Sequence, residues 1–305
     1  ISKFMVLVTG ATGILGRVIV LELLKRGKSV RATKRKSSNL QEVRKSFQFY
    51  TETPNEYFDS IEWIEVDFED IHSLQNALNG VEEVYHCAAK VSFHPKDEKK
   101  MYQTNIEGTK QLLFACQNSS VKKFLFVSSI AVLDGLNENG ELDESSDFNP
   151  KIDHSSYAIS KHFSEMEVWR ASAEGLNVAI VNPGLIIGSG NWNESSGTLF
   201  KELGENTFTF SGGTSYVDVR DVAKISVELM ENNIFGERFI LISENKKYEE
   251  IANFIKQKLG KSATKIIPNG LLKVGVFLNT ILGWLISPLK MANKVNVQSV
   301  TEFNK

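Results

Sequence analysis

The sequence predicts an α/β fold in which a doubly wound parallel sheet carries a smaller C-terminal region. Apolar runs rich in β-branched residues alternate with segments of helical periodicity from the N-terminus to about residue 185. The first run, KFMVLVT, leads into a glycine-rich turn and then into a segment with apolar residues at helical spacing. With 305 residues, the chain is long enough for one large α/β domain and an appendage.

The predicted elements follow in a regular order. The first strand covers residues 3–9, and the first helix ends near Gly27, a residue typical of helix C-termini. Further short apolar or β-branched runs predict strands, and stretches of 3.6-residue periodicity predict helices between them. The strands are expected at 28–33, 61–66, 83–91, 123–127, 176–182 and 239–242, and the helices at 38–47, 71–78, 96–117, 155–174, 216–230 and 248–259. Polar loops are expected at 51–60 and 134–150, the second over the site, and the pattern loosens into irregular structure at 188–213.

The composition argues against several classes of protein. Apolar residues make up 42% and charged residues 24%, which is ordinary for a globular chain with a large core. The net charge is −2, and no long basic run is present, so no nucleic-acid partner is expected. Cys87 and Cys116 fit neither a disulfide framework nor a metal cluster, so no metal is expected. Two reduced, buried thiols and the lack of a signal peptide favour a cytoplasmic location.

The turn at residues 10–16, GATGILG, lies between a strand and a helix, and this context gives a glycine fingerprint its meaning. Gly10 permits a tight turn, Gly13 lets the backbone approach a pyrophosphate, and Gly16 lets the helix pack against the strand. The helix N-terminus offers N–H groups and a positive dipole end to phosphates. The alternative is a glycine turn without a ligand. We therefore place the following residues at a dinucleotide: Gly10, Thr12, Gly13, Ile14, Leu15 and Gly16.

The end of the second strand favours NADP(H) over NAD. An NAD site usually has an acidic residue there to bind the ribose 2′-hydroxyl. This chain reads TKRKSS at residues 33–38 and has no carboxylate before Glu42. Cations and hydroxyls suit a 2′-phosphate, which an arginine can bind through two hydrogen bonds. Arg35 is the best candidate, assisted by Lys36 or Ser37, and the alternative is a solvated run of charges.

The ends of the third and fourth strands supply further candidate contacts. Asp67, which precedes Phe68, either accepts a hydrogen bond from the adenine amino group or caps a helix. The small pair Ala88 and Ala89, followed by Lys90, would let a flat cofactor pass close to the carboxyl end of the fourth strand. All five residues are assigned to the cofactor site.

Ser129, Tyr157 and Lys161 have the residue types needed to reduce a carbonyl or oxidise an alcohol. Tyr157 and Lys161 are four residues apart on a predicted helix and so share one face. Hydride transfer to a carbonyl leaves an alkoxide that a tyrosine can protonate, and a nearby ammonium lowers the tyrosine pKa from about 10. The Ser129 hydroxyl can polarise the same carbonyl oxygen. YxxxK also arises by chance in amphipathic helices, but the upstream glycine turn favours the catalytic interpretation.

These motifs together resemble the short-chain dehydrogenase/reductase superfamily over about residues 1–225. The resemblance lies in TGATGILG (9–16), VSS (127–129) and YAISK (157–161). Asp67, NIEGT (105–109), NPGLIIG (182–188) and YVDVRDVA (216–223) are similar to its extended branch, the NAD-dependent epimerase/dehydratase family. VRATKR (30–35), HCAAKVSF (86–93) and NPGLIIG resemble the dihydroflavonol reductase and 3β-hydroxysteroid dehydrogenase groups within that branch.

The resemblance implies a Rossmann fold and assigns further roles. The serine, tyrosine and lysine named above would form the catalytic triad, and Asn105 would support the lysine. Pro183 and Gly184 would border the nicotinamide, Arg35 would contact the 2′-phosphate, and a homodimer would form through the long helices. The reductase group usually has an acidic residue where Lys36 stands here, which strengthens the NADP(H) assignment and weakens the case for a plant-type flavonoid substrate.

The expected domains are a dinucleotide-binding Rossmann domain and a substrate-binding region. Residues 1–185 form the first, with 214–242 contributing back to it, and 186–213 and 243–305 form the second. The apolar run at 271–289 is 19 residues long, at the lower edge of transmembrane length. We expect it to form a helical wall of an apolar substrate pocket, and contact with a membrane surface is the weaker alternative.

The motifs therefore predict an NADP(H)-dependent oxidoreductase with Ser-Tyr-Lys chemistry. It would reduce a ketone or aldehyde, or oxidise a secondary alcohol, of an apolar small molecule. Two alternatives stay open: an epimerase or dehydratase of sugar nucleotides that retains NAD, and a dinucleotide-binding protein without catalysis.

Overall fold

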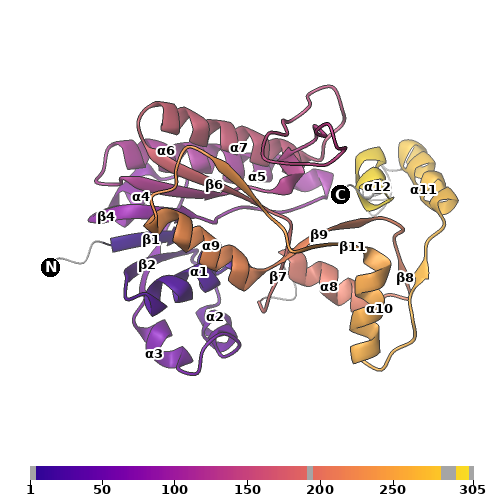
Figure 1. The fold of residues 1–305 in the computed structure, drawn as a ribbon, viewed down its shortest axis with the longest axis horizontal. Coiled ribbons are helices and arrows are strands. Elements are labelled where there is room, and N and C mark those ends of the chain that lie inside the picture. The colour runs from indigo at the N-terminus through magenta and orange to yellow at the C-terminus, as the bar shows by residue number, and fades with distance from the viewer. Residues whose placement is uncertain (1–4, 191–194, 283–292, 302–305) are drawn as a thin grey trace.

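A parallel sheet forms the centre of the molecule (Figure 1). The computed structural model describes residues 5–190, 195–282 and 293–301, and within them seven strands pair in the order β10-β6-β5-β4-β1-β2-β3. Every pairing in this sheet is parallel, and the strand order reverses between β1 and β4. The predicted doubly wound α/β fold is confirmed. The strands are β1 Met5–Thr9, β2 Ser29–Lys34, β3 Glu62–Glu65, β4 Val81–His86, β5 Lys123–Val127, β6 Asn177–Pro183 and β10 Arg238–Leu241.

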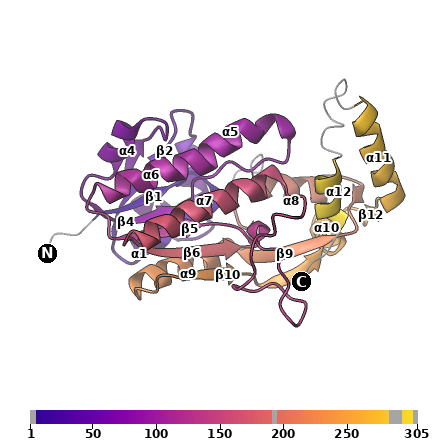
Figure 2. The ribbon, with the colours of Figure 1, turned by 90° about the horizontal axis from the view of Figure 1, so that it is seen from above.

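Helices cover both faces of the sheet (Figures 1 and 2). On one face α1 packs against α9, and on the other α6 packs between α4 and α7. Each face has its own apolar core, one containing Ile19 and Val222 and the other Leu112 and Val168. The central strands are buried on both sides, which explains their nearly continuous apolar sequences. The helices are α1 Ile14–Lys25, α2 Leu40–Phe47, α3 Pro54–Asp59, α4 Ile71–Ala77, α5 Glu98–Tyr102, α6 Gly108–Gln117, α7 Ser156–Ala173 and α9 Val219–Glu231.

A smaller region lies beyond the carboxyl ends of the main strands. Among the described residues, β7, β9 and β11 form one small sheet, and β8 pairs with β12. After β9, the chain returns to the main sheet through α9 and β10, so the region is built from two separate stretches. Its elements are β7 Leu185–Ile187, α8 Ser195–Glu205, β8 Phe208–Thr209, β9 Gly213–Asp218, β11 Glu244–Lys247, α10 Tyr248–Lys258, β12 Lys265–Ile266, α11 Asn269–Leu282 and α12 Lys294–Thr301.

Several expected element boundaries were wrong. The expected polar loop at 51–60 contains α3, which Pro54 can begin because the first helical position needs no N–H donor. The fourth strand ends at His86 rather than at residue 91. The expected irregular stretch at 188–213 contains α8 and β8. The helix expected from residue 216 begins at Val219, because Asp218 ends β9 and caps α9 by accepting from the Arg220 N–H (2.8 Å).

Two further expectations are answered only in part. α11 covers residues 271–282 of the apolar run, and its remaining part lies outside the described residues, as do residues 3 and 4 of the first expected strand. No helix in the described part of the chain is both long and apolar enough to cross a bilayer.

Cys116 is buried, as expected, whereas Cys87 is only partly buried, and both are free thiols.

Replacing Gly10 by alanine should destabilise the protein more than replacing Gly80. Both glycines have left-handed φ angles, +64° and +71°, so alanine costs about 1–2 kcal/mol at either site. A Cβ at Gly10 would also lie 2.6 Å from the Ala88 backbone nitrogen, whereas one at Gly80 would meet nothing within 4 Å. Overpacking adds about 1–3 kcal/mol. Urea unfolding of the two variants measures the difference, and equal losses would contradict it.

Candidate active site

The glycine turn lies at the carboxyl end of β1, beside β4, where the strand order reverses and α/β sheets bind ligands. The Gly13 N–H donates to the Gly10 carbonyl (2.9 Å) and closes the turn. A Cβ on Gly16 would overlap that carbonyl, so α1 can begin here only with glycine. Gly13 is exposed and is the N-cap of α1, and no side chain of the described residues caps it. The N–H groups of this turn therefore suit a phosphate.

Arg17 supports the glycine turn from inside α1, a role that the sequence analysis missed. It is 1% exposed, and its guanidinium donates to the carbonyl oxygens of Gly13 (3.0 Å) and Thr12. It also forms a bidentate ion pair with Glu42 of α2 (2.7 and 2.8 Å). The first carboxylate after β2 is thus already paired. A charged residue inside the apolar run ILGRVIVLELL was the available signal.

Arg35, Lys36 and Ser37 follow β2 and are all exposed. The Arg35 N–H donates to the Ser38 hydroxyl (3.0 Å), and the Ser38 N–H donates to the Arg35 carbonyl (3.0 Å), so the backbone forms a tight turn here. No ion pair within the described residues includes the side chain of Arg35 or Lys36, in contrast to the neighbouring Lys34, which pairs with Glu65 (3.6 Å). Their charges are therefore available to an anion.

Two aspartates that follow β3 make different hydrogen bonds. Asp67 accepts from the Glu69 N–H (2.9 Å) in a local turn, while Asp70 caps α4 by accepting from the His72 N–H (3.0 Å). Of the two alternatives for Asp67, helix capping is therefore wrong. Phe68 stacks its ring on His86 (centroids 5.9 Å apart), which places it in the packing beneath the site.

The loop after β4 lies directly against the glycine turn. The Ala88 N–H donates to the Thr9 hydroxyl (3.3 Å), and Ala89 is exposed at the carboxyl end of the sheet. The Lys90 backbone is held by Asn105, which accepts from its N–H (2.7 Å) and donates to its carbonyl (3.0 Å). The Lys90 ammonium pairs with Asp97 (3.5 Å), so this loop is fixed on both sides.

Asn105 lies in a π-helical turn, Gln103–Glu107, that interrupts the helix expected at 96–117. Such turns are frequent at functional sites. Besides Lys90, its side chain bonds the Ser160 hydroxyl (2.9 Å), and its carbonyl accepts from Ser164 (2.7 Å). Among the described residues no bond joins Asn105 to Lys161. Asn105 therefore contacts α7 at Ser160, the residue before Lys161, and its support of the lysine stays a prediction.

Ser129, Tyr157 and Lys161 come together at the carboxyl ends of β5 and β6. The Ser129 oxygen accepts from the Ala131 N–H (3.2 Å), and its side chain lies close enough to Tyr157 to lower the pKa of the phenol. Lys161 is 2% exposed. Its ammonium donates to the Val127 carbonyl (2.7 Å) and lies 4.1 Å from the centre of the Phe126 ring.

Burial controls the protonation of this pair. Burial lowers the pKa of Lys161 to about 7, and the negative charge of Glu165 opposes that shift. Burial also raises the pKa of Tyr157, against the opposing effect of the Ser129 hydroxyl. The expected lowering of the tyrosine pKa by Lys161 is absent. Burial in a low-dielectric site disfavours the charged forms of both side chains.

Glu165, one turn after Lys161 in α7, is a buried carboxylate that the sequence analysis did not assign. It accepts from the Ser128 hydroxyl (2.6 Å) and from the Asn182 amide (3.2 Å). The same amide donates to the Ser129 carbonyl (3.0 Å). Glu165 thus fixes the ends of β5 and β6 on either side of the candidate serine. Its place one turn from the lysine, on the same helix face, was the available signal.

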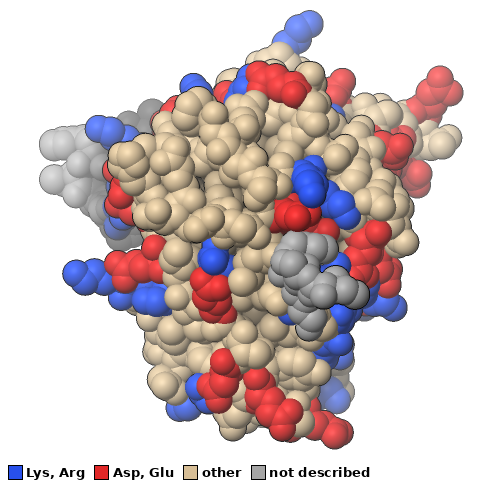
Figure 3. Space-filling view, turned by 90° about the vertical axis from the view of Figure 1, so that its left-hand side faces the viewer, with Lys and Arg blue, Asp and Glu red and all other residues tan. Residues whose placement is uncertain are grey.

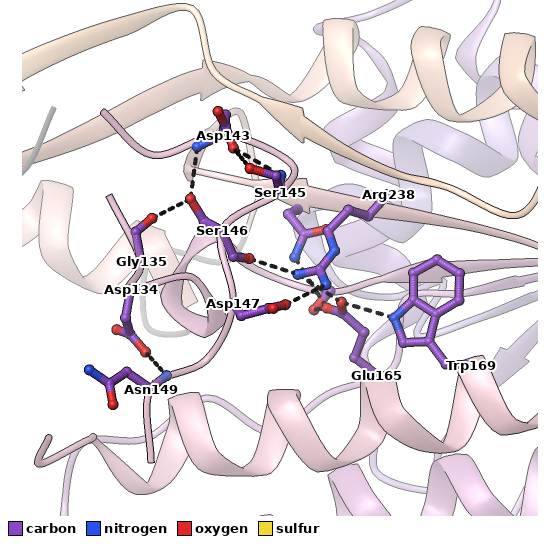
Figure 4. Close-up of polar contacts among 12 residues, drawn as sticks. Asp134, Gly135, Asp143, Ser145, Ser146, Asp147, Asn149, Glu165, Trp169 and Arg238 are labelled. Atoms are coloured by element: carbon purple, nitrogen blue, oxygen red, sulfur yellow. Dashed lines mark hydrogen bonds and ion pairs between the residues drawn. The ribbon is translucent and has the colours of Figure 1, made fainter. Parts of the chain in front are cut away.

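Arg238 of β10 extends this network to the loop at 134–150 (Figure 4). Its guanidinium lies 3.5 Å from Glu165 and 3.5 Å from Asp147, and it donates to the Ser146 carbonyl (3.3 Å). The Glu144 carboxylate accepts from the Ile240 N–H (2.9 Å). The loop expected over the site is therefore anchored to the edge of the main sheet.

A cavity of about 180 Å³ lies at the start of α7, and Tyr157 is near it without lining it. Phe93 connects the two, because its ring centroid is 6.3 Å from that of Tyr157 and it lines the cavity. The Asn296 amide donates to the Phe93 carbonyl (3.1 Å), so the C-terminal segment closes one side. The lining residues are Ser92, Phe93, His94, Pro95, Glu98, His154, Ser155, Ser156, Asn293, Val295 and Asn296.

Comparison with known proteins identifies the family. The model of the NAD dependent epimerase/dehydratase family matches residues 6–241. The chain belongs to this family. Sterol demethylase protein B of Methylococcus capsulatus is 30% identical over 257 residues, which cover 83% of this chain and 74% of that protein. A putative dihydroflavonol 4-reductase of Synechocystis is 28% identical over 270 residues, covering 85% and 73%. The crystal structure of gox2253 superposes with a TM-score of 0.80 at 25% identity and covers 98% and 88%.

Membership of the epimerase/dehydratase family makes the chain an NAD(P)-dependent enzyme acting on CH–OH or C=O groups. The glycine turn fits such a cofactor on structural grounds, because its helix N-terminus is uncapped in the described chain and a Cβ at Gly10 would strike Ala88. Pro183, which ends β6, and Gly184, which follows it, lie at the same end of the sheet as the glycine turn, because the strands are parallel.

Lys161→Met should flatten the rise of stability with pH between pH 7 and 9. The unfolded lysine keeps its proton up to about pH 10.4, whereas the buried amine loses it near pH 7. Between these values the unfolded state binds more protons, so stability increases with pH. The melting temperature of the wild type should therefore rise relative to that of the variant. Cys87, whose pKa burial raises to about 12, is present in both proteins and cancels. Parallel pH profiles would contradict the burial effect.

Proposed function

We propose that this enzyme is an NADP(H)-dependent oxidoreductase that reduces a ketone or aldehyde, or oxidises a secondary alcohol, of an apolar small molecule. The observation that carries the proposal is that Ser129 lies next to Tyr157, with Lys161 one turn further along α7. All three lie at the carboxyl end of the sheet that also carries the glycine turn. Cytoplasmic location and a homodimer stay predictions.

The side chains of the site can polarise the substrate carbonyl and supply the proton that the reduction needs. Reduced cofactor, when bound, supplies the hydride that forms the new C–H bond. With substrate bound, the Ser129 hydroxyl can donate its proton to the substrate carbonyl in place of the Tyr157 oxygen. The raised pKa of Tyr157 keeps its hydroxyl protonated at neutral pH, so it can give its proton to that oxygen and complete the alcohol. Solvent then returns a proton to the tyrosine.

Lys161 has donors left for a sugar hydroxyl. An ammonium has three N–H donors, and the described contacts use one, to the Val127 carbonyl. The remaining donors suit the ribose of a nicotinamide nucleotide. A bound polar group of this kind also replaces solvation that burial removed, so it favours the charged lysine.

The preference for NADP(H) is supported by two features. Arg35 and Lys36 are exposed cations at the end of β2. The first carboxylate beyond them, Glu42, is paired with Arg17 and so is not free to accept from a ribose 2′-hydroxyl. A dianionic 2′-phosphate matches the cations better than a hydroxyl does.

The apolar substrate class is supported by the relatives' names. They are named for a sterol and a dihydroflavonol, which are not sugar nucleotides. Phe93, which lies beside Tyr157 at the cavity, offers an aromatic surface to such a molecule.

Tyr157→Phe should lower NADPH-dependent carbonyl reduction by about 10²-fold or more, since the proton donor is lost. NADPH should still raise the melting temperature of the variant, because the glycine turn is intact. Tyr102→Phe is the matched control. It removes the hydroxyl of a partly buried tyrosine that lies outside the triad, so turnover should be unchanged. Steady-state assays with a ketone and steroid panel measure this. Unchanged turnover in Tyr157→Phe would remove the tyrosine from the mechanism.

Arg35→Ala should weaken NADP⁺ binding by about 10–100-fold and leave NAD⁺ binding unchanged, because it removes hydrogen bonds to a charged phosphate. Fluorescence titration of both nucleotides gives the two affinities. Arg44→Ala is the control, since Arg44 is already paired with Asp59. Equal losses for both nucleotides would contradict the assignment. NAD retained through purification, with stabilisation by sugar nucleotides, would favour the epimerase alternative instead.

A further inference from the structure

We propose that α11 docks on an anionic phospholipid surface and so places the substrate cavity beside the membrane. The docking itself is independent of catalysis. The purpose that we assign to docking is the delivery of an apolar substrate from the bilayer, and this part rests on the proposed function.

The first observation is an apolar face of α11 that the protein leaves exposed. Leu271, Val274, Phe277 and Leu278 are 63%, 52%, 65% and 38% exposed. Their spacing of three, four and seven residues puts them on one side of the helix. Single exposed apolar residues need no explanation, but four on one helix face do. Lys273 is also exposed and borders this face.

The second observation is the charge of the chain around α11. Residues 251–301 contain seven lysines and no aspartate or glutamate, although the whole chain has a net charge of −2. Two of these lysines, Lys273 of α11 and Lys265 four residues before α11 begins, are exposed, and no ion pair within the described residues includes them. The opposite end of the molecule differs, because Figure 3 shows cations and anions intermixed there.

These two observations select a lipid surface among the partners that could cover the face. An exposed apolar helix with neighbouring lysines is the pattern of interfacial binding to anionic lipids. Lysine stems can lie along the apolar boundary while the ammonium groups reach the headgroups. A second copy of the chain would bring two lysine-only regions together and would be repelled.

The docking face is linked to the candidate active site through α12. α12 packs against α11, and its residues Val295 and Asn296 line the cavity that reaches Phe93 and so Tyr157. Figures 1 and 2 both place α11 and α12 together, at the end of the molecule opposite the start of β1. A lipid surface against α11 would therefore lie next to the substrate side of the enzyme.

Flotation of the full chain with vesicles tests the proposal. We expect it to float with vesicles of phosphatidylcholine and phosphatidylglycerol, and less with phosphatidylcholine alone. Added salt should weaken the binding. Phe277→Glu should lower the bound fraction at least about tenfold, because it places a charge in the apolar contact. Phe163→Glu, at an exposed apolar residue of α7, is the matched control and should bind like the wild type.

The lysines are tested separately. Lys265→Gln and Lys273→Gln should each weaken binding to the anionic vesicles about fivefold. Melting temperatures and light scattering check that each variant folds and keeps its oligomeric state. The proposal is overturned if the wild type does not float with anionic vesicles, if Phe277→Glu floats equally well, or if that variant dissociates an oligomer. Turnover of a short soluble ketone is measured in parallel, so loss of catalysis and loss of docking are distinguishable.

Discussion

The contact between Gly10 and the backbone of Ala88 is the constraint on which the candidate site depends. It brings the glycine turn and the loop after β4 so close that a single Cβ would separate them. That loop is in turn bonded through Lys90 to Asn105, and Asn105 is bonded to Ser160 in α7. A continuous set of short contacts thus joins the place for the phosphates to the helix that carries the tyrosine and lysine. Their relative position is fixed by backbone geometry rather than by long, flexible side chains.

A second set of contacts controls the electrostatics of the same helix. Lys161 is buried under an aromatic ring and one carbonyl, while Glu165, one turn away, is buried among hydrogen-bond donors. Each buried charge disfavours folding by itself, and the two partly compensate. Burial brings the pKa of Lys161 close to neutral pH, and a bound polar ligand can shift the amine toward its charged form. The cofactor and the protonation of the site are therefore coupled by burial.

Much of the main sheet could be predicted from the sequence because its strands are buried on both faces and read as apolar runs. Lys123–Val127 was predicted with its observed bounds for this reason. The site residues at strand ends could also be found, since parallel strands bring their carboxyl ends together. The π turn at Asn105 could not be predicted, because one extra residue per turn leaves no periodic signal. Arg17 and Glu165 were missed because their partners, Glu42 and Arg238, are distant in sequence, and pairing across such distances is set only by the fold.

The two segments over the substrate side are held very differently. The loop at 134–150 is tied to the main sheet through Arg238, whose guanidinium reaches the buried Glu165. The C-terminal segment is tied there by the Asn296 amide to the Phe93 carbonyl and by an exposed pair between Lys294 and Asp153. Exposed ion pairs contribute at most about 1 kcal/mol, so the pair between Lys294 and Asp153 adds little to the attachment of α12. The cavity at Phe93 is therefore closed on one side by α12, which in turn packs against the apolar helix α11.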